Sequence, residues 1–510
     1  MPEKEPLPRV IIGAVPAPIY TCAEVRGLEQ AAARLAGAPR LMERAGRAAA
    51  ERARTVMADT ARRVLVLAGP GNNGGDAFEV AAHLKHWFFG VTVVFTGDRG
   101  KLSADAGAAL AKWEAAGGET LCAIPVRERW GLVIDGLFGI GLQRPLEGRH
   151  AELIAQVNAL RVPVLALDVP SGINADTGAV MGCAVRAAHT ITFIGLKPGL
   201  LTADGPDHCG ALRVDALGLE PEALRAPQGR LLDEAVLSQA LSPRPRNFHK
   251  GLAGTAAILG GATGMVGAVI LAGRGALKCG AGRVHMALLT DRPPYVDYGQ
   301  PELMLRNPEE LPAAGELAVI AAGPGMGKGE NARRALRMAL ESKCALVLDA
   351  DALNLMSEDP VLAELASGRD AATLLTPHPA EAGRLLGITT RQVQADRLAA
   401  SAAIAKRYRA FAALKGNGTI VAAPDGRWWV NPTGNAGMAA AGMGDALTGI
   451  LAGLLAQGAA PLQALLAGVW LHGAAGDAVA RAGPLGLTAS ELIDAARTLL
   501  NRSLYRAASS

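Results

Sequence analysis

The sequence has few aromatic residues, no closely paired cysteines and no long run of basic residues. Aromatic side chains make up 4% of the 510 residues while 62 residues are glycine, a composition typical of an α/β protein rich in small aliphatic residues. The six cysteines form no C-x-x-C pair and have no zinc-binding spacing to histidine, so we expect buried free thiols in a reducing compartment. The net charge of +4 is spread along the chain, so we expect a small-molecule enzyme with no nucleic-acid partner.

The sequence also lacks an export signal and an uninterrupted membrane-spanning segment. The first residues, "MPEKEPLPRVIIGAVPAP", combine charges with several prolines, and no apolar segment of signal-peptide length follows them. No charged residue occurs between Asp445 and Asp477, but glutamines, a proline and glycines interrupt this stretch. We therefore expect two buried helices joined at "AQGAAP", no membrane contact and a cytoplasmic location.

Strand-like apolar runs alternate with helical patterns in two series, which predicts an α/β protein of two doubly wound domains. The first series is "RRVLVLA", "VTVVFTG", "GLVIDGLFG", "VPVLALDVPSG" and "HTITFIG". The second is "GTAAILGG", "GRVHMALL", "LAVIAAGPG", "CALVLDADAL", "ATLLTPHPAE" and "GTIVAAP". A polar, proline-rich segment around residues 221–247 separates them. We expect domains at residues 1–225 and 246–510, joined by a linker over 226–245.

A glycine-rich loop follows the first apolar run, in the stretch "LVLAGPGNNGGDAFEVAAHL" (residues 65–84). Its glycines have the G-x-G-x-x-G spacing of a dinucleotide-binding loop, and Asp98 ends the next run. However, Asn72, Asn73 and Asp76 add oxygen ligands and a negative charge where a phosphate would lie. Three interpretations stay open from these residues: a Rossmann dinucleotide loop, a structural glycine turn, and a polar site for a cation and a ligand.

Polar residues follow two further apolar runs of the first half. Asp135 follows "LVI", Asp168 follows "VLAL", and Ser171 comes shortly after Asp168. Ligands bind outside the carboxyl ends of parallel strands, so we expect the loops "GPGNNGGD", "DGLFGIG" and "DVPSG" to converge on one crevice. Each aspartate could instead cap its own turn. In a shared crevice, Asn73, Asp135 and Ser171 could bind one monovalent cation, and Asp168 would be free to act as an acid or a base.

Residues from about 18 to 219 resemble the NAD(P)H-hydrate epimerase domain. The resemblance is carried by "YTCAEVRGLEQ", "LMERAG", "GPGNNGGD", "DGLFGIGLQRPLEG", "DVPSGINADTG" and "TFIGLKPGL". It implies a Rossmann-like domain that interconverts the R and S epimers of NADHX and NADPHX, with Asp168 as catalytic residue and potassium on Asn73, Asp135 and Ser171. It implies that the hydrated nucleotide contacts Asn72, Asn73, Gly74, Gly75, Asp76, Gly139, Ile140, Gly141, Leu142, Gln143, Arg144, Pro145 and Asp168.

In the second half, a run of small residues in "NPTGNAGMAAAGMGDALTG" leads into a predicted helix that begins near Gly444. Free backbone N–H groups and the helix dipole at such an N-terminus form an anion hole. Asp445 lies at its mouth, where a carboxylate would repel phosphate. A base that takes a proton from a hydroxyl being phosphorylated explains this residue best. The alternative is an N-terminal helix cap.

From about 246 to 500 the sequence resembles the ADP/ATP-dependent NAD(P)H-hydrate dehydratase of the ribokinase-like superfamily. The segments that match are "HKGLAGTAAILGGATGMVGA", "AAGPGMGKG", "LDADALN", "TPHPAE", "LKGNGTIV" and the helix segment above. The resemblance implies phosphorylation of the C6 hydroxyl of the S epimer, followed by elimination of phosphate. It implies hydrate contacts at Ala268, Gly325, His378 and Asp445, and adenine-nucleotide contacts at Lys415, Gly416, Asn417, Gly418, Thr419 and Gly444. Phosphoryl transfer also calls for magnesium, with Glu381 as a candidate ligand.

The sequence departs from these family patterns at four positions. Ala77 and Ala380 stand where glycine is usual, and Ile140 and Met443 stand where a hydroxyl side chain is usual. The Ala77 methyl group is expected to fit if that residue already lies in the helix. Loss of the hydroxyl at Ile140 would cost about 0.5–1.5 kcal/mol of hydrogen bonding.

The two resemblances together predict a bifunctional enzyme that repairs hydrated nicotinamide nucleotides. We expect it to use ADP, releasing AMP and phosphate, with ATP as the alternative cosubstrate, to need K⁺ and Mg²⁺, and to form a homo-oligomer. Two rival functions stay open: an NAD-dependent dehydrogenase, and a ribokinase-like sugar or vitamin kinase with an accessory ligand-binding domain.

Overall fold

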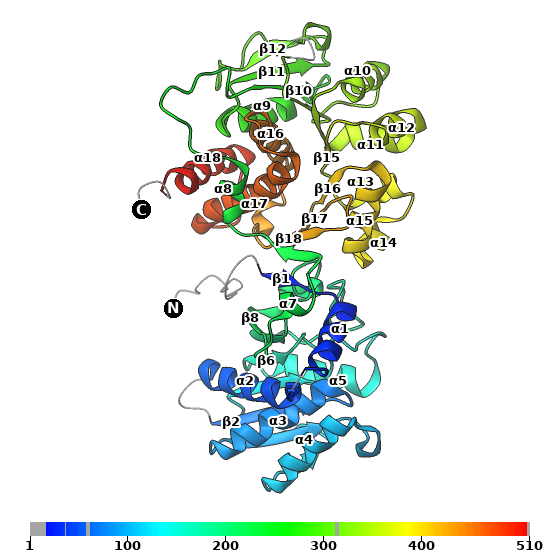
Figure 1. The fold of residues 1–510 in the computed structure, drawn as a ribbon, viewed down its shortest axis with the longest axis vertical. Coiled ribbons are helices and arrows are strands. Elements are labelled where there is room, and N and C mark those ends of the chain that lie inside the picture. The colour runs from blue at the N-terminus through cyan, green and yellow to red at the C-terminus, as the bar shows by residue number, and fades with distance from the viewer. Residues whose placement is uncertain (1–16, 36, 58–61, 312–315, 507–510) are drawn as a thin grey trace. The chain divides into compact units, whose positions relative to one another are not determined.

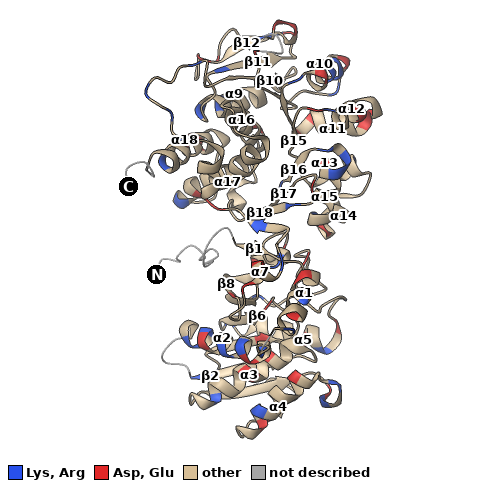
Figure 2. Ribbon diagram, in the orientation of Figure 1, with Lys and Arg blue, Asp and Glu red and all other residues tan. Residues whose placement is uncertain are grey.

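The structure is a computed structural model that describes residues 17–35, 37–57, 62–311 and 316–506. The chain divides into two compact units, residues 1–230 and 231–510 (Figure 1), and charged residues of both signs occur in each unit (Figure 2). Residues 1–16, which carry most of the segment tested for an export signal, lie outside the described residues.

The first unit is built on a parallel sheet. Its strands are β2 (Arg63–Ala68), β3 (Gly90–Phe95), β4 (Thr120–Leu121), β5 (Leu132–Gly136), β6 (Val164–Leu167), β7 (His189–Phe193) and β8 (Ala211–Asp215). Their order is β4-β3-β2-β5-β6-β7-β8, and each neighbouring pair is parallel. The order reverses between β2 and β5. A ligand crevice is therefore expected beside the loops that follow these two strands.

Helices cover both faces of this sheet, which is why its strands read as continuous apolar runs. The helices are α1 (Cys22–Ala32), α2 (Leu41–Val56), α3 (Asn72–His86), α4 (Ala104–Ala115), α5 (Gly148–Ala159), α6 (Gly205–Cys209) and α7 (Pro221–Leu224), with single turns η1 (Arg99–Lys101) and η2 (Pro198–Leu200). In β2, Val64 and Val66 pack in a cluster with α1 to α4, whereas Leu65 and Leu67 pack with α5. A short antiparallel pair, β1 (Pro18–Ile19) and β9 (Gly229–Leu231), completes the unit.

The sheet of the second unit is parallel at its centre and antiparallel at one side. Its strands are β10 (Thr255–Gly260), β11 (Arg283–Leu288), β12 (Met304–Arg306), β13 (Val319–Ala322), β14 (Ala345–Leu348), β15 (Thr373–Leu375), β16 (Phe411–Leu414), β17 (Thr419–Ala422) and β18 (Trp428–Asn431). Within this unit the order is β18-β17-β16-β15-β14-β13-β10-β11-β12. The pairs β16–β17 and β17–β18 are antiparallel, because residues 415–418 are too few for a parallel crossover.

Helices again cover both faces, so the expected fold class of two α/β domains is confirmed. They are α8 (Ala235–Ala240), α9 (Val266–Lys278), α10 (Glu330–Glu341), α11 (Ala350–Glu358), α12 (Pro360–Ser367), α13 (Pro379–Leu386), α14 (Thr390–Ala395), α15 (Arg397–Tyr408), α16 (Met443–Ala456), α17 (Pro461–Val479) and α18 (Ala489–Arg506), with single turns η3 (Pro308–Glu310), η4 (Ala436–Met438) and η5 (Ala480–Ala482). In β10, Ala256 and Ile258 face α9 and α16 to α18, and Ala257 and Leu259 face α10 to α15 (Figure 1).

Small residues let α16 lie directly against its neighbours. A methyl group placed on Gly449 of α16 would lie 2.1 Å from the carbonyl oxygen of Ala272 in α9. A methyl group placed on Gly473 of α17 would lie 2.2 Å from Thr433 Oγ1, in the loop that leads to α16. Because no side chain separates these backbones, the position of the α16 N-terminus is tightly fixed.

Three expectations from the sequence can be compared with the structure: two buried helices, a linker over residues 226–245, and buried cysteines. The uncharged stretch forms α16 and α17, joined at residues 457–460, which confirms two buried helices. Among the described residues, no helix has the length and apolar character needed to span a membrane. The segment 226–245 is not an unstructured linker, because it contains β9 and α8, and Leu232 and Leu237 are buried. The cysteines are unpaired, but Cys122 is exposed, which corrects the expectation that all are buried.

Two candidate active sites

The first candidate site lies at the carboxyl edge of the first sheet, where the strand order reverses. β2, β5 and β6 are parallel neighbours, so the loops after them leave from one edge. A methyl group placed on Gly139 would lie 3.3 Å from both Asn73 Oδ1 and Asp168 Oδ2. One residue from each loop therefore meets at this point.

Close packing requires three glycines of the loop after β2, namely Gly69, Gly74 and Gly75. A methyl group on Gly69 would lie 1.7 Å from the carbonyl oxygen of Leu137, and one on Gly74 would lie 2.0 Å from that of Gly69. Gly75 similarly leaves room for Met42, because a methyl group on Gly75 would lie 2.6 Å from the Met42 side chain. The structural-turn interpretation therefore accounts for these glycines, but it leaves the polar residues of the loop unexplained.

The polar residues of this loop have three different environments. The exposed Asn72 accepts a hydrogen bond of 2.8 Å from Ser103. Asn73 is buried, and its Nδ2 has no hydrogen-bond partner among the described residues. Burial raises the pKa of Asp76 well above its ordinary value, and the nearby Asp168 and Glu29 raise it further. A site that already collects three carboxyl groups is a poor place for a bare phosphate.

Asp168 is the most constrained residue of the site. Its backbone has a φ of 62°, in the left-handed region that non-glycine residues rarely adopt. Its Oδ1 accepts a hydrogen bond from Lys197 Nζ, and Thr192 Oγ1 donates to the same oxygen over 3.2 Å. Lys197 is fully buried. Asp168 therefore does not cap its own turn. Its Oδ1 accepts hydrogen bonds from the neighbouring strand β7 and from the loop after that strand.

Asp135 and Ser171 bond to each other at the base of the same crevice. Ser171 donates from Oγ to Asp135 Oδ1 over 2.6 Å and from its backbone N–H to Oδ2 over 2.8 Å. Leu137 N–H also donates to Asp135 over 3.3 Å, so the turn-capping interpretation holds for this residue. Burial raises the pKa of Asp135, although the hydrogen bonds from Ser171 and Leu137 partly offset the rise.

The loop at residues 139–145 presents mostly backbone and exposed side chains to the crevice. The side chain of Leu142 is buried in a cluster with Leu137 and Leu146, so only its backbone can face a ligand. The Ile140 carbonyl accepts a hydrogen bond of 3.4 Å from Arg26. Gly141 is exposed, and so are the side chains of Gln143, Arg144 and Pro145. Ala77 lies inside α3 and is fully buried, so its extra methyl group fits, as expected.

The second candidate site also lies at a carboxyl edge, beside the reversal of strand order between β10 and β13. Gly325 follows β13 with a φ of 53°, and a methyl group on it would lie 3.3 Å from the Ala268 side chain of α9. Asp351 accepts a hydrogen bond of 2.8 Å from the Gly327 N–H and so anchors this loop. These contacts bring Ala268 and Gly325 together.

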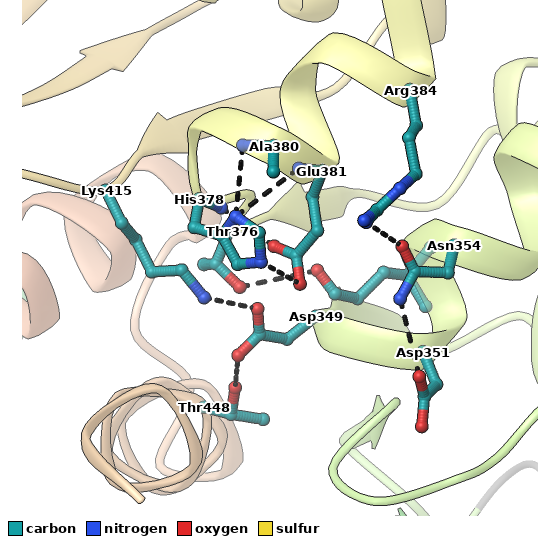
Figure 3. Close-up of polar contacts among 11 residues, drawn as sticks. Asp349, Asp351, Asn354, Thr376, His378, Ala380, Glu381, Arg384, Lys415 and Thr448 are labelled. Atoms are coloured by element: carbon teal, nitrogen blue, oxygen red, sulfur yellow. Dashed lines mark hydrogen bonds and ion pairs between the residues drawn. The ribbon is translucent and has the colours of Figure 1, made fainter. Parts of the chain in front are cut away.

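A buried aspartate joins three elements of this site (Figure 3). Asp349, at the end of β14, is 1% exposed. Its Oδ1 accepts a hydrogen bond of 2.6 Å from Lys415 Nζ, and its Oδ2 accepts one of 2.9 Å from Thr448 Oγ1 on α16. Burial alone would lower the pKa of Lys415, but Asp349, Glu381 and Asp445 together raise it above its ordinary value. Lys415 is therefore a charged ammonium surrounded by carboxyl groups.

Asp445 lies in the first turn of α16, and its side chain makes no hydrogen bond or ion pair with another described residue. The N-cap is Gly442, with a φ of 85°, and no side chain in the described part of the chain caps this helix. A methyl group on Gly444 would lie 3.3 Å from both Asp349 Oδ2 and Lys415 Nζ. Burial raises the pKa of Asp445 to about 6, with Asp349 adding to the rise and Lys415 opposing it. Asp445 therefore does not cap α16.

His378 caps α13 and is held by Glu381 (Figure 3). Its Nδ1 accepts hydrogen bonds from the N–H groups of Ala380 and Glu381, so the proton lies on Nε2, 3.2 Å from Glu381 Oε1. Burial lowers the pKa of His378, and Lys415 lowers it further. Burial raises the pKa of Glu381 to about 7. Because both Glu381 oxygens face His378, Glu381 positions the histidine and is poorly placed as a magnesium ligand.

The loop between β16 and β17 contains the candidate nucleotide contacts Lys415 to Thr419. Arg397 is 1% exposed and donates hydrogen bonds to the carbonyl oxygens of Leu414 and Lys415 over 3.2 and 3.3 Å. A methyl group on Gly416 would lie 2.8 Å from the Arg397 guanidinium, and Thr419 Oγ1 donates to the Gly416 carbonyl over 3.1 Å. Arg397 therefore fixes the backbone of this hairpin loop, while Asn417 lies exposed at its tip.

Comparisons with known proteins cover both units. The family model for NAD(P)H-hydrate dehydratase matches residues 256–498, and the model for the YjeF-related protein N-terminus matches residues 38–199. The bifunctional NAD(P)H-hydrate repair enzyme Nnr of Coxiella burnetii is 40% identical over 90% of this chain and 94% of that protein. The enzyme of the same name from Escherichia coli is 37% identical over 96% of this chain and 95% of that protein.

The chain belongs to the bifunctional NAD(P)H-hydrate repair enzyme family. Among solved structures, the ADP/ATP-dependent NAD(P)H-hydrate dehydratase from Bacillus subtilis, co-crystallized with ATP/Mg²⁺, is 31% identical and covers 53% of this chain and 97% of that one, with a TM-score of 0.46.

Membership in the repair enzyme family favours the repair function over both rivals. The dehydrogenase interpretation needs Asp98 to bind a ribose, but Asp98 instead accepts a hydrogen bond of 3.0 Å from Gly100 and caps a single turn. The kinase interpretation gives the first unit no chemistry, although that unit has its own family match and a constrained carboxylate.

Sequence reasoning missed two residues of this repair enzyme that the structure brings into the sites, Lys197 and Asp349. The sequence pattern could have indicated each of them. Lys197 is the lone charged residue in "TFIGLKPGL", and Asp349 is the first aspartate of "LDADALN". Two surface cavities of about 380 and 430 Å³ lie along α11 to α15, and neither is lined by His378, Lys415 or Asp445.

Proposed function

We propose that this protein repairs hydrated nicotinamide nucleotides with two active sites, an epimerase site around Asp168 and a dehydratase site around Asp445. The observation that carries the proposal is the matching arrangement of the two units. Each unit holds a carboxylate at the carboxyl edge of its sheet, in the segment where the family motif has it. Hydration yields both epimers of NADHX and NADPHX, and the dehydratase accepts one. Joining both activities in one chain therefore lets all of the damaged cofactor be recovered.

At the first site, Asp168 is the proton acceptor and donor. The C6 carbon of the hydrate carries a hydroxyl next to the ring nitrogen, so inversion requires one bond at C6 to open and close again. Asp168 takes the hydroxyl proton as the C6–N1 bond opens, with the bond's electron pair going to the nitrogen. It returns the proton when the ring closes on the other face. Asn72 to Asp76 and the loop 139–145 hold the nucleotide around this group.

Potassium is the cation we assign to Asn73, Asp135 and Ser171. The environment of Asp135 supports this assignment. Asp135 is fully buried, and no described lysine or arginine forms an ion pair with it. A monovalent cation beside it would offset the burial that raises its pKa. Asn73 offers its amide oxygen Oδ1 in the same region, 3.3 Å from a methyl group placed on Gly139. These residues fit a potassium ion, which would stabilise the loops around the substrate.

At the second site, Asp445 takes the proton from the C6 hydroxyl of the S epimer while that oxygen attacks the terminal phosphorus of ADP. The backbone N–H groups at the start of α16 and the charged Lys415 stabilise the phosphate. Phosphate then leaves C6 with the electron pair of its C–O bond while a proton is lost from C5. This forms the C5–C6 double bond of NADH or NADPH, and AMP and phosphate are released. Ala268, Gly325 and His378 contact the hydrate, and Lys415 to Thr419 with Gly444 contact the adenine nucleotide.

Magnesium, when bound with the nucleotide, would neutralise the charge of its phosphates at this site. The described residues contain no group of three or more His, Cys, Asp or Glu side chains that could hold a metal ion by themselves. This fits magnesium, which binds mainly through phosphates and one or two carboxylates. ADP is favoured over ATP because the fused arrangement resembles bacterial and archaeal members. A homo-oligomer stays a prediction.

The proposal is tested by incubating the protein with mixed R and S NADHX, ADP and magnesium, and following NADH absorbance. We expect recovery of NADH from both epimers. Recovery of the S epimer alone would remove the epimerase activity, and no recovery with either ADP or ATP would overturn the proposal. Consumption of ADP or ATP with a sugar or a vitamin but not with the hydrate would favour the kinase alternative.

A further inference from the structure

We propose that Lys197 is a positioning residue for epimerisation, which clamps one oxygen of Asp168 so that the other alone acts on the substrate. The inference rests on the proposed epimerase function, and it gives a role to Lys197, which is not one of the proposed substrate contacts. Lys197 lies between β7 and η2, at the carboxyl edge of the sheet.

The hydrogen bonds of Lys197 show that it acts through Asp168 and not on a ligand. Its ammonium group has three N–H donors, and the structure uses all of them. They go to Asp168 Oδ1, to Thr192 Oγ1 over 2.8 Å and to the Phe193 carbonyl oxygen over 2.7 Å. Lys197 is 0% exposed. It has no donor left for a substrate and no surface on which a substrate could lie.

The two oxygens of Asp168 are in different environments. Oδ1 accepts from Lys197, from Thr192 Oγ1 over 3.2 Å and from the Phe193 N–H over 3.4 Å. No described residue donates a hydrogen bond to Oδ2, which faces Gly139. The side chain is 12% exposed. One oxygen is thus fixed inside the fold, and the other is presented where the three loops converge.

The surroundings of Asp168 make a cation necessary. The other charged or titratable groups that interact with Asp168 or with its neighbours are Cys22, Arg26 and Glu29 on α1, Asp76 and Glu79 on α3, and Asp176. Most of these groups are acids, and Arg26 is partly committed to the Ile140 carbonyl. Lys197 is the cation in direct contact with Asp168, so it offsets part of the negative charge that gathers around this carboxylate.

The first test measures R/S exchange of NADHX by Lys197→Met as a function of pH. Without the ammonium, Asp168 binds its proton more tightly, so activity that needs the carboxylate is lost at a higher pH. We expect kcat to fall at least tenfold with KM within about threefold, and the acidic limb of the profile to move up by more than about one pH unit. An unchanged profile, or a raised KM with unchanged kcat, would overturn the proposal.

A double-mutant cycle separates positioning from a purely structural role. If Lys197 acts through Asp168, adding Lys197→Met to Asp168→Asn causes no further loss of exchange. Losses that multiply would show that Lys197 contributes independently of Asp168. The rate of NADH formation from purified S epimer by the same preparations monitors the second unit, and thermal unfolding monitors the first.

A milder pair of variants decides the question if Lys197→Met does not fold. Thr192→Val removes one hydroxyl that bonds both Lys197 and Asp168, whereas Thr190→Val removes an equally buried hydroxyl on the same strand that bonds the Cys209 carbonyl over 2.7 Å. We expect slower exchange and an upward shift of the acidic limb for Thr192→Val only. Equal behaviour of the two variants would overturn the clamp. Failure of the wild-type protein to exchange epimers would instead overturn the proposed epimerase function.

Discussion

The two units place a carboxylate at the same kind of position, but they hold it in opposite ways. In the first unit, Asp168 is bonded to a fully buried lysine, Lys197. In the second unit, the neighbouring ammonium of Lys415 bonds to Asp349 instead, and Asp445 has no hydrogen-bond donor among the described residues. One base is therefore fixed before substrate arrives, and the other is left to titrate.

The difference matches what each reaction demands. Epimerisation opens and closes one ring and needs a base whose geometry is preorganised. Phosphorylation needs a base that accepts a proton next to a cluster of negative charge, so a raised pKa is useful to Asp445. Lys415, held by Asp349, keeps its positive charge available to the phosphate without neutralising Asp445. The comparison yields four predictions, taken from the largest expected effect to the smallest.

Asp445→Asn is expected to slow NADH formation on the order of 10² to 10⁴ while leaving epimer exchange intact, because it keeps the size of the side chain and loses the base. ADP affinity should stay within a few-fold, since the anion hole is built from backbone N–H groups. The measurements are NADH absorbance, ADP titration and R/S exchange, with Asp425→Asn in an exposed turn as the control. Near wild-type NADH formation would show that Asp445 is not the base.

Asp168→Asn is expected to slow epimer exchange on the order of 10², because it removes the proton acceptor. The measurable loss is limited because the hydrate, with its hydroxyl next to the ring nitrogen, also exchanges slowly without the enzyme. This variant should also be less stable, since Lys197 would lose its carboxylate. Breaking a buried ion pair costs about 3–5 kcal/mol, and asparagine retains one oxygen for Lys197, so the loss should be smaller. Thermal unfolding and exchange rates test both points. Unchanged exchange would remove Asp168 from the mechanism.

The two activities should respond differently to acid. Burial raises the pKa of Asp445 to about 6, and a base acts only when ionised, so kcat/KM of the dehydratase should fall about tenfold per unit below pH 6. Epimer exchange has no reason to share this break, because a different carboxylate with its own cation carries it. Both rates are measured from about pH 4.5 to about pH 8, a range that brackets the pKa of Asp445. A shared break would end the contrast between the sites.

Potassium should affect only the first site, and by several-fold. The buried Asp135 would lose the ion that balances its charge, so exchange should slow when a bulky organic cation replaces potassium. NADH formation from purified S epimer in the same buffers is the matched control. Equal exchange rates in both cations would remove the potassium site, and an equal loss in both activities would point to a general salt effect.

The central strands could be predicted from the sequence, but the outer ones could not. β2, β5, β10 and β14 are buried on both faces and therefore form continuous apolar runs. β8 and β18 lie towards the sides of their sheets and carry partly exposed residues, so their patterns are weak. The antiparallel hairpin of β16 and β17 depends on the length of one loop and not on the composition of its strands.

The sequence by itself determined where the strands end and which residues lie in the motifs, because periodicity and local turn chemistry act over a few neighbouring positions. It could not determine what each carboxylate contacts. From the sequence, Asp168 could have capped its own turn, whereas the structure pairs Asp168 with Lys197, 29 residues away. Asp349 likewise meets Lys415 across 66 residues. Only tertiary structure decides such pairs, because burial and the distance between charges depend on which distant segments pack together, and these set each group's charge.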